Sequence, residues 1–168
     1  MIQYQLFPKY RQITTDLNSV VSVFERNFNS ISSVKNVLPS NEVLCALQKD
    51  LESIGFIIEK SKKKDDKIKI PVLFGKNGRV EKSFDADGIN MNSKTVLEIE
   101  AGRAVSNYQF LKDLFQACMM QDIDNLIIAV RNSYRGNPDF EVVVTFFETL
   151  YASGRIQLPL HRILIIGY

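Results

Sequence analysis

Two acid-bearing runs separated by a short polar turn constrain this chain more than any other feature. Residues 80–89 and 95–100 alternate between apolar and polar side chains, which is the pattern of half-buried strands. The polar pair Asn92-Ser93 lies between these runs and predicts a two-residue hairpin turn. With that turn the two runs pair antiparallel, and residues whose numbers sum to 185 face each other.

This register brings four carboxylates together on one face of the hairpin. Asp87 lies opposite Glu98, and Asp85 lies opposite Glu100. Carboxylates that face each other across a strand pair repel, so a purely structural hairpin would avoid them. A divalent cation such as Mg²⁺ instead takes clustered oxygen ligands. The pattern therefore predicts a cation site, and an acidic face exposed to solvent is the alternative.

Hydrophobic periodicity predicts the remaining elements. Helices are expected at 15–31, with Thr15 or Asp16 as its cap, at 41–54, at 104–121, and from Pro138 to the stop at Gly154. Strands are expected at 56–60, 68–74, 124–133 and 162–167. Asn77-Gly78 predicts a tight turn, so the strands from 56 to 100 would form one antiparallel meander.

This order of elements predicts an α/β fold, a sandwich in which helices flank a central mixed sheet. The length of 168 residues fits a single domain, 1–168. Within it we expect residues 1–39 to form an N-terminal helical extension and residues 40–168 to form the core. The net charge of +2 is too small to indicate a polyanionic partner by itself.

Composition excludes several classes of protein. The single histidine, His161, excludes zinc sites built from several imidazoles. The Gly-x-x-x-x-Gly-Lys-[Ser/Thr] loop is absent, so no nucleotide cofactor is expected. Cys45 and Cys118 occupy apolar helical positions and are expected to be buried free thiols. The chain has no long apolar run and no signal-peptide pattern, so we expect a cytoplasmic protein without a membrane partner.

The acid-bearing hairpin resembles the active-site core of the PD-(D/E)XK nuclease superfamily, whose members have the restriction-endonuclease-like fold. Ala86-Asp87 stands where this family has Pro-Asp, and Glu98-Ile99-Glu100 stands where it has Glu-x-Lys. The resemblance covers residues 84–103 as a motif and about 40–168 as an order of elements. Glu100 departs from the motif lysine, and in this respect the chain is similar to the BamHI-type enzymes.

The resemblance implies a DNA endonuclease that depends on Mg²⁺ or Mn²⁺, with a type II restriction endonuclease as the favoured class. Asp87 and Glu98 would hold the ion, together with the backbone carbonyl of Ile99 and with Asp85. Glu100 and Lys112 are then the candidates for activating the water, and Arg103 is the candidate for clamping the phosphate. A repair or structure-specific nuclease, and a non-catalytic DNA- or protein-binding member of the fold, remain the alternatives.

Two groups of basic and polar residues are candidate DNA contacts. One group surrounds the expected hairpins and comprises Lys62, Lys63, Lys64, Arg79 and Lys82. The other follows the strand at 124–133 and comprises Arg131, Tyr134 and Arg135. A solvated loop is the alternative for both groups. A palindromic double-strand cutter would also need a homodimer contact, for which the N-terminal helix is the candidate.

Overall fold

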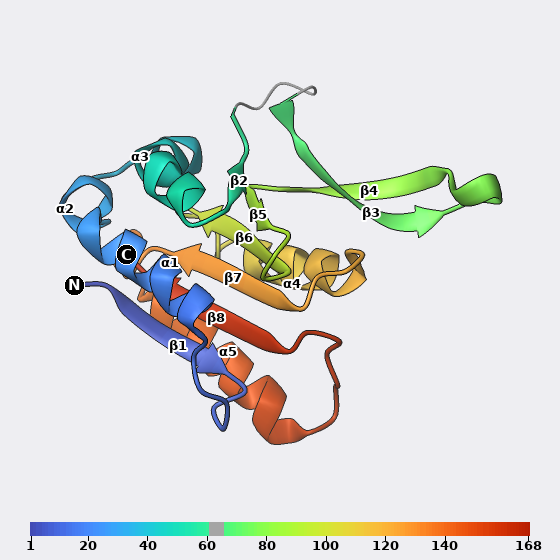
Figure 1. Ribbon diagram of the computed structural model, residues 1–168. Coiled ribbons are helices and arrows are strands. Elements are labelled where there is room, and N and C mark those ends of the chain that lie inside the picture. Colours follow the sequence, from blue (N-terminus) through green and yellow to red (C-terminus); the bar gives the residue numbers. More distant parts are fainter. Residues whose placement is uncertain (61–65) are drawn as a thin grey trace.

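Within residues 1–60 and 66–168, which the computed structural model describes, six strands form one mixed sheet between two layers of helices (Figure 1). In order across the sheet they are β1 (Gln3–Phe7), β8 (Arg162–Gly167), β7 (Asn125–Val130), β6 (Thr95–Glu100), β5 (Gly88–Asn90) and β2 (Ile57–Ile58). β6, β7 and β8 are parallel, and antiparallel strands complete both edges. The predicted α/β sandwich with a central mixed sheet is confirmed.

Helices cover both faces of this sheet. One face carries α1 (Thr15–Arg26), α2 (Phe28–Ile31) and α3 (Ser40–Ser53), and the other carries α4 (Gln109–Met119) and α5 (Asp139–Ser153). The segment from Leu126 to Val130 in β7 is fully buried. Its uninterrupted apolar sequence follows from this position, because a strand covered on both faces has no side chain that meets water.

Two helices end at the glycines that the sequence predicts, whereas α4 begins later than predicted. Gly55 and Gly154 follow α3 and α5 with φ of +92° and +61°, a conformation that glycine adopts without a steric penalty. α1 is capped by the Thr14 side chain, one residue before the predicted cap. α4 begins at Gln109 rather than at residue 104, because Tyr108 is left-handed with φ of +52°.

The N-terminal segment 1–39 packs as part of the same body. β1, which sequence analysis did not predict, pairs antiparallel with β8 along the edge of the sheet. The apolar stripe of α1, which includes Val20 and Phe24, is buried against the sheet with α3. This stripe is therefore used within the chain, so a homodimer contact through α1 would have to use its polar face.

The predicted continuous meander is wrong, because two of its strands leave the sheet. β3 (Ile68–Phe74) and β4 (Val80–Ala86) pair with each other as a separate ribbon that extends past α4 (Figure 1). β2 pairs with β5 instead of β3. The chain bends at Asp87, between β4 and β5, so the two halves of the expected long strand belong to different sheets.

The turn of the ribbon is the one that the sequence predicts. Asn77 and Gly78 both have positive φ, 59° and 72°, and the Arg79 amide donates to the Lys76 carbonyl across them. Two central residues with positive φ match the right-handed twist of the flanking strands, which is why Asn-Gly favours this turn. In the part of the chain that is described, no helix is long and apolar enough to cross a lipid bilayer.

Candidate active site

The register of β5 and β6 agrees with the predicted hairpin. Gly88 pairs with Leu97 and Ile89 pairs with Val96, so paired numbers sum to 185 as expected. The connection is longer than the two residues predicted, because residues 91–94 lie outside both strands. The Asn90 side-chain carbonyl closes it by accepting hydrogen bonds from the amides of residues 92 and 93.

Asp87 lies at the point where this pairing ends. Its Oδ2 accepts a hydrogen bond of 2.8 Å from the Ile99 amide, in place of a backbone carbonyl. The bond holds the Asp87 carboxylate at the edge of β6, next to Glu98. The amide and carbonyl of one residue in an extended strand point to the same side. The Ile99 carbonyl, which sequence analysis proposed as a metal ligand, therefore also faces Asp87.

The faces of β6 are divided as predicted. Leu97 and Ile99 are buried among the residues of α1 and α3. Val96 belongs to the opposite core, beneath α4 and α5. Glu98 and Glu100 follow Val96 at two-residue spacing, so both carboxylates point toward α4.

The predicted pairing of Asp85 with Glu100 is wrong. Asp85 belongs to β4 and pairs with Lys69 in the ribbon, because the bend at Asp87 carries β4 away from β6. Asp85 nevertheless lines the same pocket as Asp87 and Glu98. It approaches the site from the ribbon rather than from the sheet.

These side chains line a pocket of about 340 Å³ between the sheet, the ribbon and α4. Its lining residues are Glu59, Lys67, Ser83, Phe84, Asp85, Ala86, Asp87, Glu98, Lys112 and Gln116. A second pocket of about 500 Å³ adjoins it on the side of α3 and shares Glu59, Lys67 and Asp87 with it. Asp87 therefore lines both pockets, one on the side of α4 and one on the side of α3.

Burial makes the negative charges of this site costly. It raises the pKa of Asp87 to about 6, although the hydrogen bond from Ile99 acts in the opposite direction. The pKa of Glu98 is raised well above its ordinary value by burial, then by the charges of Asp87 and Asp113. Two neighbouring carboxylates whose pKa values are raised by burial form a site where a bound cation would offset the cost of their negative charge.

Glu100 lies next to a second acid, Asp113, which sequence analysis did not select. Burial raises the pKa of Glu100 to about 8, and the charge of Asp113 and a hydrogen bond with it add to this effect. Asp113 lies in α4 and is only 2% exposed, and its Oδ1 is 3.3 Å from the Lys112 ammonium. Glu100 and Asp113 therefore form a second pair of buried acids, and Lys112 lies beside Asp113 as the neighbouring cation.

Lys112 is a protonated cation in this arrangement. Burial by itself would lower its pKa, but Asp113, Glu100 and Glu98 together raise it. A lysine whose pKa is raised keeps its proton at neutral pH and does not act as a base. The role that remains for Lys112 is to supply positive charge at the wall of the pocket.

The donor set fits a hard cation that keeps most of its waters. Within residues 1–60 and 66–168, no three His, Cys, Asp or Glu side chains already form a metal-binding group. Mg²⁺ asks a protein for only one or two carboxylates, and Asp87 and Glu98 provide that number.

Among solved structures the chain has a likeness of fold. No protein-family model matches the chain, and no curated protein matches it. The chain is similar in fold to a restriction endonuclease. The crystal structure of free BglII is 11% identical to it with a TM-score of 0.48, over 99% of this chain and 78% of that one. A likeness at this level assigns no site residue and no activity.

Sequence analysis missed an ion pair that closes the pocket. Lys67 lies 2.8 Å and 2.9 Å from the two carboxylate oxygens of Glu59, whose amide donates to the Asp87 carbonyl. The pair thus joins the base of the ribbon to the strand that adjoins Asp87. Lys67 is part of a lysine-rich stretch, where nothing in the sequence separates it from its neighbours.

The candidate DNA contacts after β7 divide into a buried and an exposed group. Arg131 is only 4% exposed and donates to the Leu38 carbonyl, so its guanidinium is used inside the fold. Tyr134 stacks between Arg131 and Arg135, at 5.0 Å and 5.2 Å from their guanidinium carbons. Arg135 is exposed and remains available to a ligand.

The other candidates lie in different places. Arg103 is exposed and lines a small pocket with Ser40 and Glu100, beside the C-terminal end of β6. Arg79 and Lys82 are exposed on the ribbon. Lys62, Lys63 and Lys64 lie outside the described residues.

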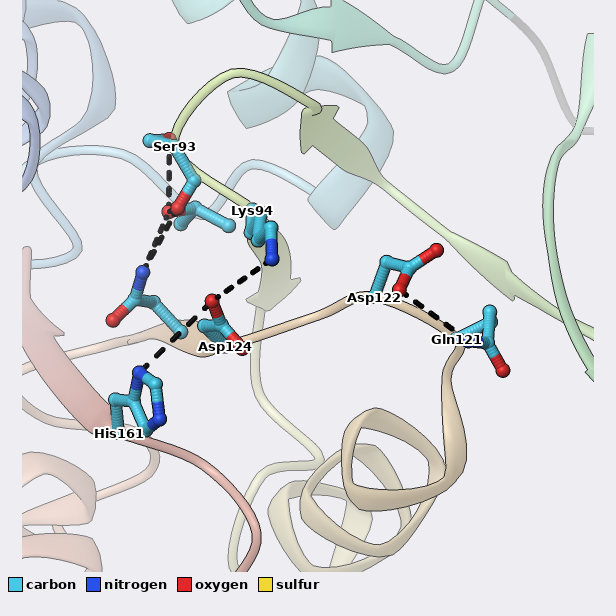
Figure 2. A network of polar contacts seen from close by, with 8 residues as sticks. Ser93, Lys94, Gln121, Asp122, Asp124 and His161 are labelled. Carbon is cyan, nitrogen blue, oxygen red and sulfur yellow. Dashed lines mark hydrogen bonds and ion pairs between the residues drawn. The ribbon is translucent and has the colours of Figure 1, made fainter.

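A polar cluster joins the N-terminal ends of the parallel strands β6, β7 and β8 (Figure 2). The Asp124 carboxylate lies 3.5 Å from the Lys94 ammonium and 3.9 Å from His161 Nδ1. His161 therefore lies before β8 and does not line the acidic pocket. Cys45 is exposed rather than buried as predicted, and both cysteines are free thiols.

Proposed function

We propose that this chain is a Mg²⁺-dependent endonuclease that hydrolyses the phosphodiester bonds of DNA, as a type II restriction endonuclease does. The observation that carries the proposal is the tie between the Asp87 carboxylate and the Ile99 amide, which fixes Asp87 beside Glu98. Together with Lys112 in the same pocket, these two carboxylates provide an ion site with a cation next to it. The motif at residues 86–100 supports the same chemistry.

Asp87 and Glu98 are the residues that would hold the ion. The Ile99 carbonyl would add a third oxygen, and Asp85 would act through water from the wall of the ribbon. When bound, Mg²⁺ neutralises charge that builds on the phosphate and lowers the pKa of a water molecule. The raised pKa values of Asp87 and Glu98 support this assignment, because burial makes both negative charges unfavourable and a bound cation would offset that cost.

The remaining residues have distinct roles in the proposed reaction. The water oxygen attacks phosphorus, the bond from phosphorus to the leaving sugar oxygen breaks, and the proton of the water passes to a base. Glu100 is that base above its pKa of about 8, and Asp113 keeps it oriented. Lys112 and Arg103 add positive charge for the phosphate oxygens.

A non-catalytic DNA-binding protein is the second candidate function. The observation that favours it is Glu100, which stands where the PD-(D/E)XK pattern has a lysine and whose pKa is raised by burial and by Asp113. Such a protein would keep the DNA-binding surface and would use the acids as a structural ion site. It would shift the mobility of DNA without cutting it.

Incubation of the purified chain with plasmid DNA distinguishes these functions. Discrete fragments that require Mg²⁺ and disappear with EDTA support restriction cleavage. Branched-substrate cleavage or smears indicate a repair or structure-specific nuclease. Intact plasmid with a gel shift supports the non-catalytic function. Intact plasmid without a shift, under conditions where the chain is folded, contradicts both candidates.

A further inference from the structure

We propose that the β3–β4 ribbon is an arm that enters the major groove of double-stranded DNA next to the acidic pocket. The inference rests on the proposed function and names the groove contact that this function needs. The basal half of the ribbon is anchored to the body of the protein. Its Ile70 side chain is buried, and the Gln121 amide donates to the carbonyl of its Pro71. The distal half extends from the body of the molecule (Figure 1).

Charge is concentrated on this arm. The ribbon, residues 68–86, contains four basic and two acidic residues, which gives a net charge of +2. The whole chain also has a net charge of +2, so all other residues together contribute 0. Of the two acids, Asp85 lies at the base and lines the acidic pocket. Glu81 lies against the backbone of Gly75, where its carboxylate would clash with any added Cβ. A projecting cationic element on an otherwise neutral protein matches a polyanionic partner.

Three of the basic side chains on the distal half are free to meet phosphates. Lys76, Arg79 and Lys82 are exposed, and within the described residues none of them takes part in an ion pair. Lys82 lies over the Phe84 ring, at 5.5 Å from its centroid. This contact directs its ammonium along the surface that leads from the tip to the pocket.

Exposed apolar side chains occupy the same distal half. Leu73 is 55% exposed, Phe74 is 46% exposed and Val80 is 49% exposed. In the major groove, apolar side chains contact the methyl group of thymine, which no other base presents. The apolar side chains of the ribbon would therefore contact base edges in the groove, while the basic side chains beside them contact the phosphates on its two rims.

The dimensions agree with this partner. The major groove is about 12 Å wide and admits a two-stranded ribbon. Ser83 in β4 lines the acidic pocket, and Arg79 precedes it by four residues, immediately before β4, which at ~3.3 Å per residue is about 13 Å. The turn therefore lies about one groove width from the pocket in which the cleaved phosphate would bind.

The edges of the ribbon argue against pairing with a strand of another protein. Pro71 lacks an amide hydrogen, and the register of β3 and β4 shifts between Pro71 and Phe74. A bulge with proline and nearby lysines is the usual protection of an edge against strand addition. The side chains of the ribbon, rather than its backbone, are then its binding groups.

The test is binding of a labelled 20-base-pair duplex, measured by fluorescence anisotropy in EDTA, with the full-length chain. Lys76→Ala/Arg79→Ala should weaken binding about tenfold and reduce the slope of log K against log salt by about 2. The matched control Lys35→Ala/Arg155→Ala removes the same charge from exposed positions elsewhere. It should change neither quantity.

Hydrolysis of bis(p-nitrophenyl) phosphate with Mn²⁺, a substrate too small to reach the turn, should be equal in the wild type and the ribbon variant. Equal DNA affinity of the ribbon variant and the control would overturn the inference even if the chain cuts DNA. Absence of duplex binding by the wild type would overturn it too. Weaker DNA binding of the ribbon variant with no DNA cleavage by the wild type would support the arm and contradict the proposed nuclease.

Discussion

The amide of Ile99 donates to the carboxylate of Asp87 at 2.8 Å. This bond lies where the pairing of β5 with β6 ends and where β4 leaves the sheet, and it holds Asp87 next to Glu98. The acidic pocket and the base of the ribbon therefore meet at Asp87.

Removal of either central acid should abolish cleavage without unfolding the chain. Asp87→Asn keeps an oxygen that can accept the Ile99 amide, and Glu98→Gln keeps the shape of its side chain. Both variants should lose at least about 100-fold in Mg²⁺-dependent plasmid cleavage, because the ion loses a charged ligand. Their melting temperatures should equal or exceed that of the wild type, since a buried charge repulsion is removed.

The control for these variants is Glu25→Gln, which removes an exposed acid from α1. It should cut at the wild-type rate. Full activity of Asp87→Asn or Glu98→Gln in the same assay would rule out the assignment of that residue to the ion site.

Stability of the metal-free protein should fall as the pH rises from about 5 to 9. The folded-state pKa of Asp87 is about 6 and that of Glu100 is about 8, both above the ordinary values of about 4 for these groups in an unfolded chain. In this interval the folded state binds more protons than the unfolded state, so the free energy of unfolding decreases with pH. Thermal melting in EDTA at several pH values measures this slope.

Mg²⁺ should reverse the trend, because it binds the deprotonated acids of the folded state. The increase in melting temperature on adding Mg²⁺ should therefore be larger at pH 8 than at pH 5.5. In the double variant Asp87→Asn/Glu100→Gln the pH slope should flatten. An unchanged slope in this variant would show that other groups cause it.

Substitutions of Glu100 and Lys112 should separate their roles. Glu100→Gln can still hydrogen-bond Asp113, so it should fold normally and lose cleavage above pH 8, where only a carboxylate accepts a proton. Lys112→Met removes the cation beside the buried Asp113, so it should lower both the melting temperature and kcat. Wild-type kcat in Glu100→Gln across the pH range would exclude Glu100 as the base.

Gly102 should not tolerate a side chain. Its φ is +111°, and an added Cβ would lie 2.6 Å from the Tyr134 ring. Gly102→Ala should cost about 1–3 kcal/mol from backbone strain, or about 3–10 °C in melting temperature for a chain of this length, and the clash with Tyr134 should add to this loss. It should also weaken DNA binding if Arg135 is a contact, because Tyr134 stacks against Arg135.

Gly136 is the matched control. Its φ is +83°, but an added Cβ would have no atom within 4 Å. Gly136→Ala should therefore show only the backbone effect and lose less stability than Gly102→Ala. Calorimetry on the two variants provides the comparison, and equal losses would mean that the contact with Tyr134 contributes nothing.

The sequence by itself determined the features that depend on neighbouring residues. Alternation fixed the faces of β6, so Glu98 and Glu100 point away from Leu97 and Ile99. The uninterrupted apolar run of β7 predicted its central place, and Asn77-Gly78 predicted the turn of the ribbon. These signals are local because side-chain alternation and turn conformation are properties of a few consecutive residues.

Only the tertiary structure decided which distant residues meet. Lys67 lines the acidic pocket from a loop, Asp113 in α4 meets Glu100, and Arg131 became a buried contact of Leu38. The separation of β3 and β4 from the sheet, which begins next to Asp87, is likewise a long-range feature. Long-range packing and the desolvation of charge determine which of these distant residues come into contact. Neither effect produces a periodic pattern in the sequence, so neither can be read from it.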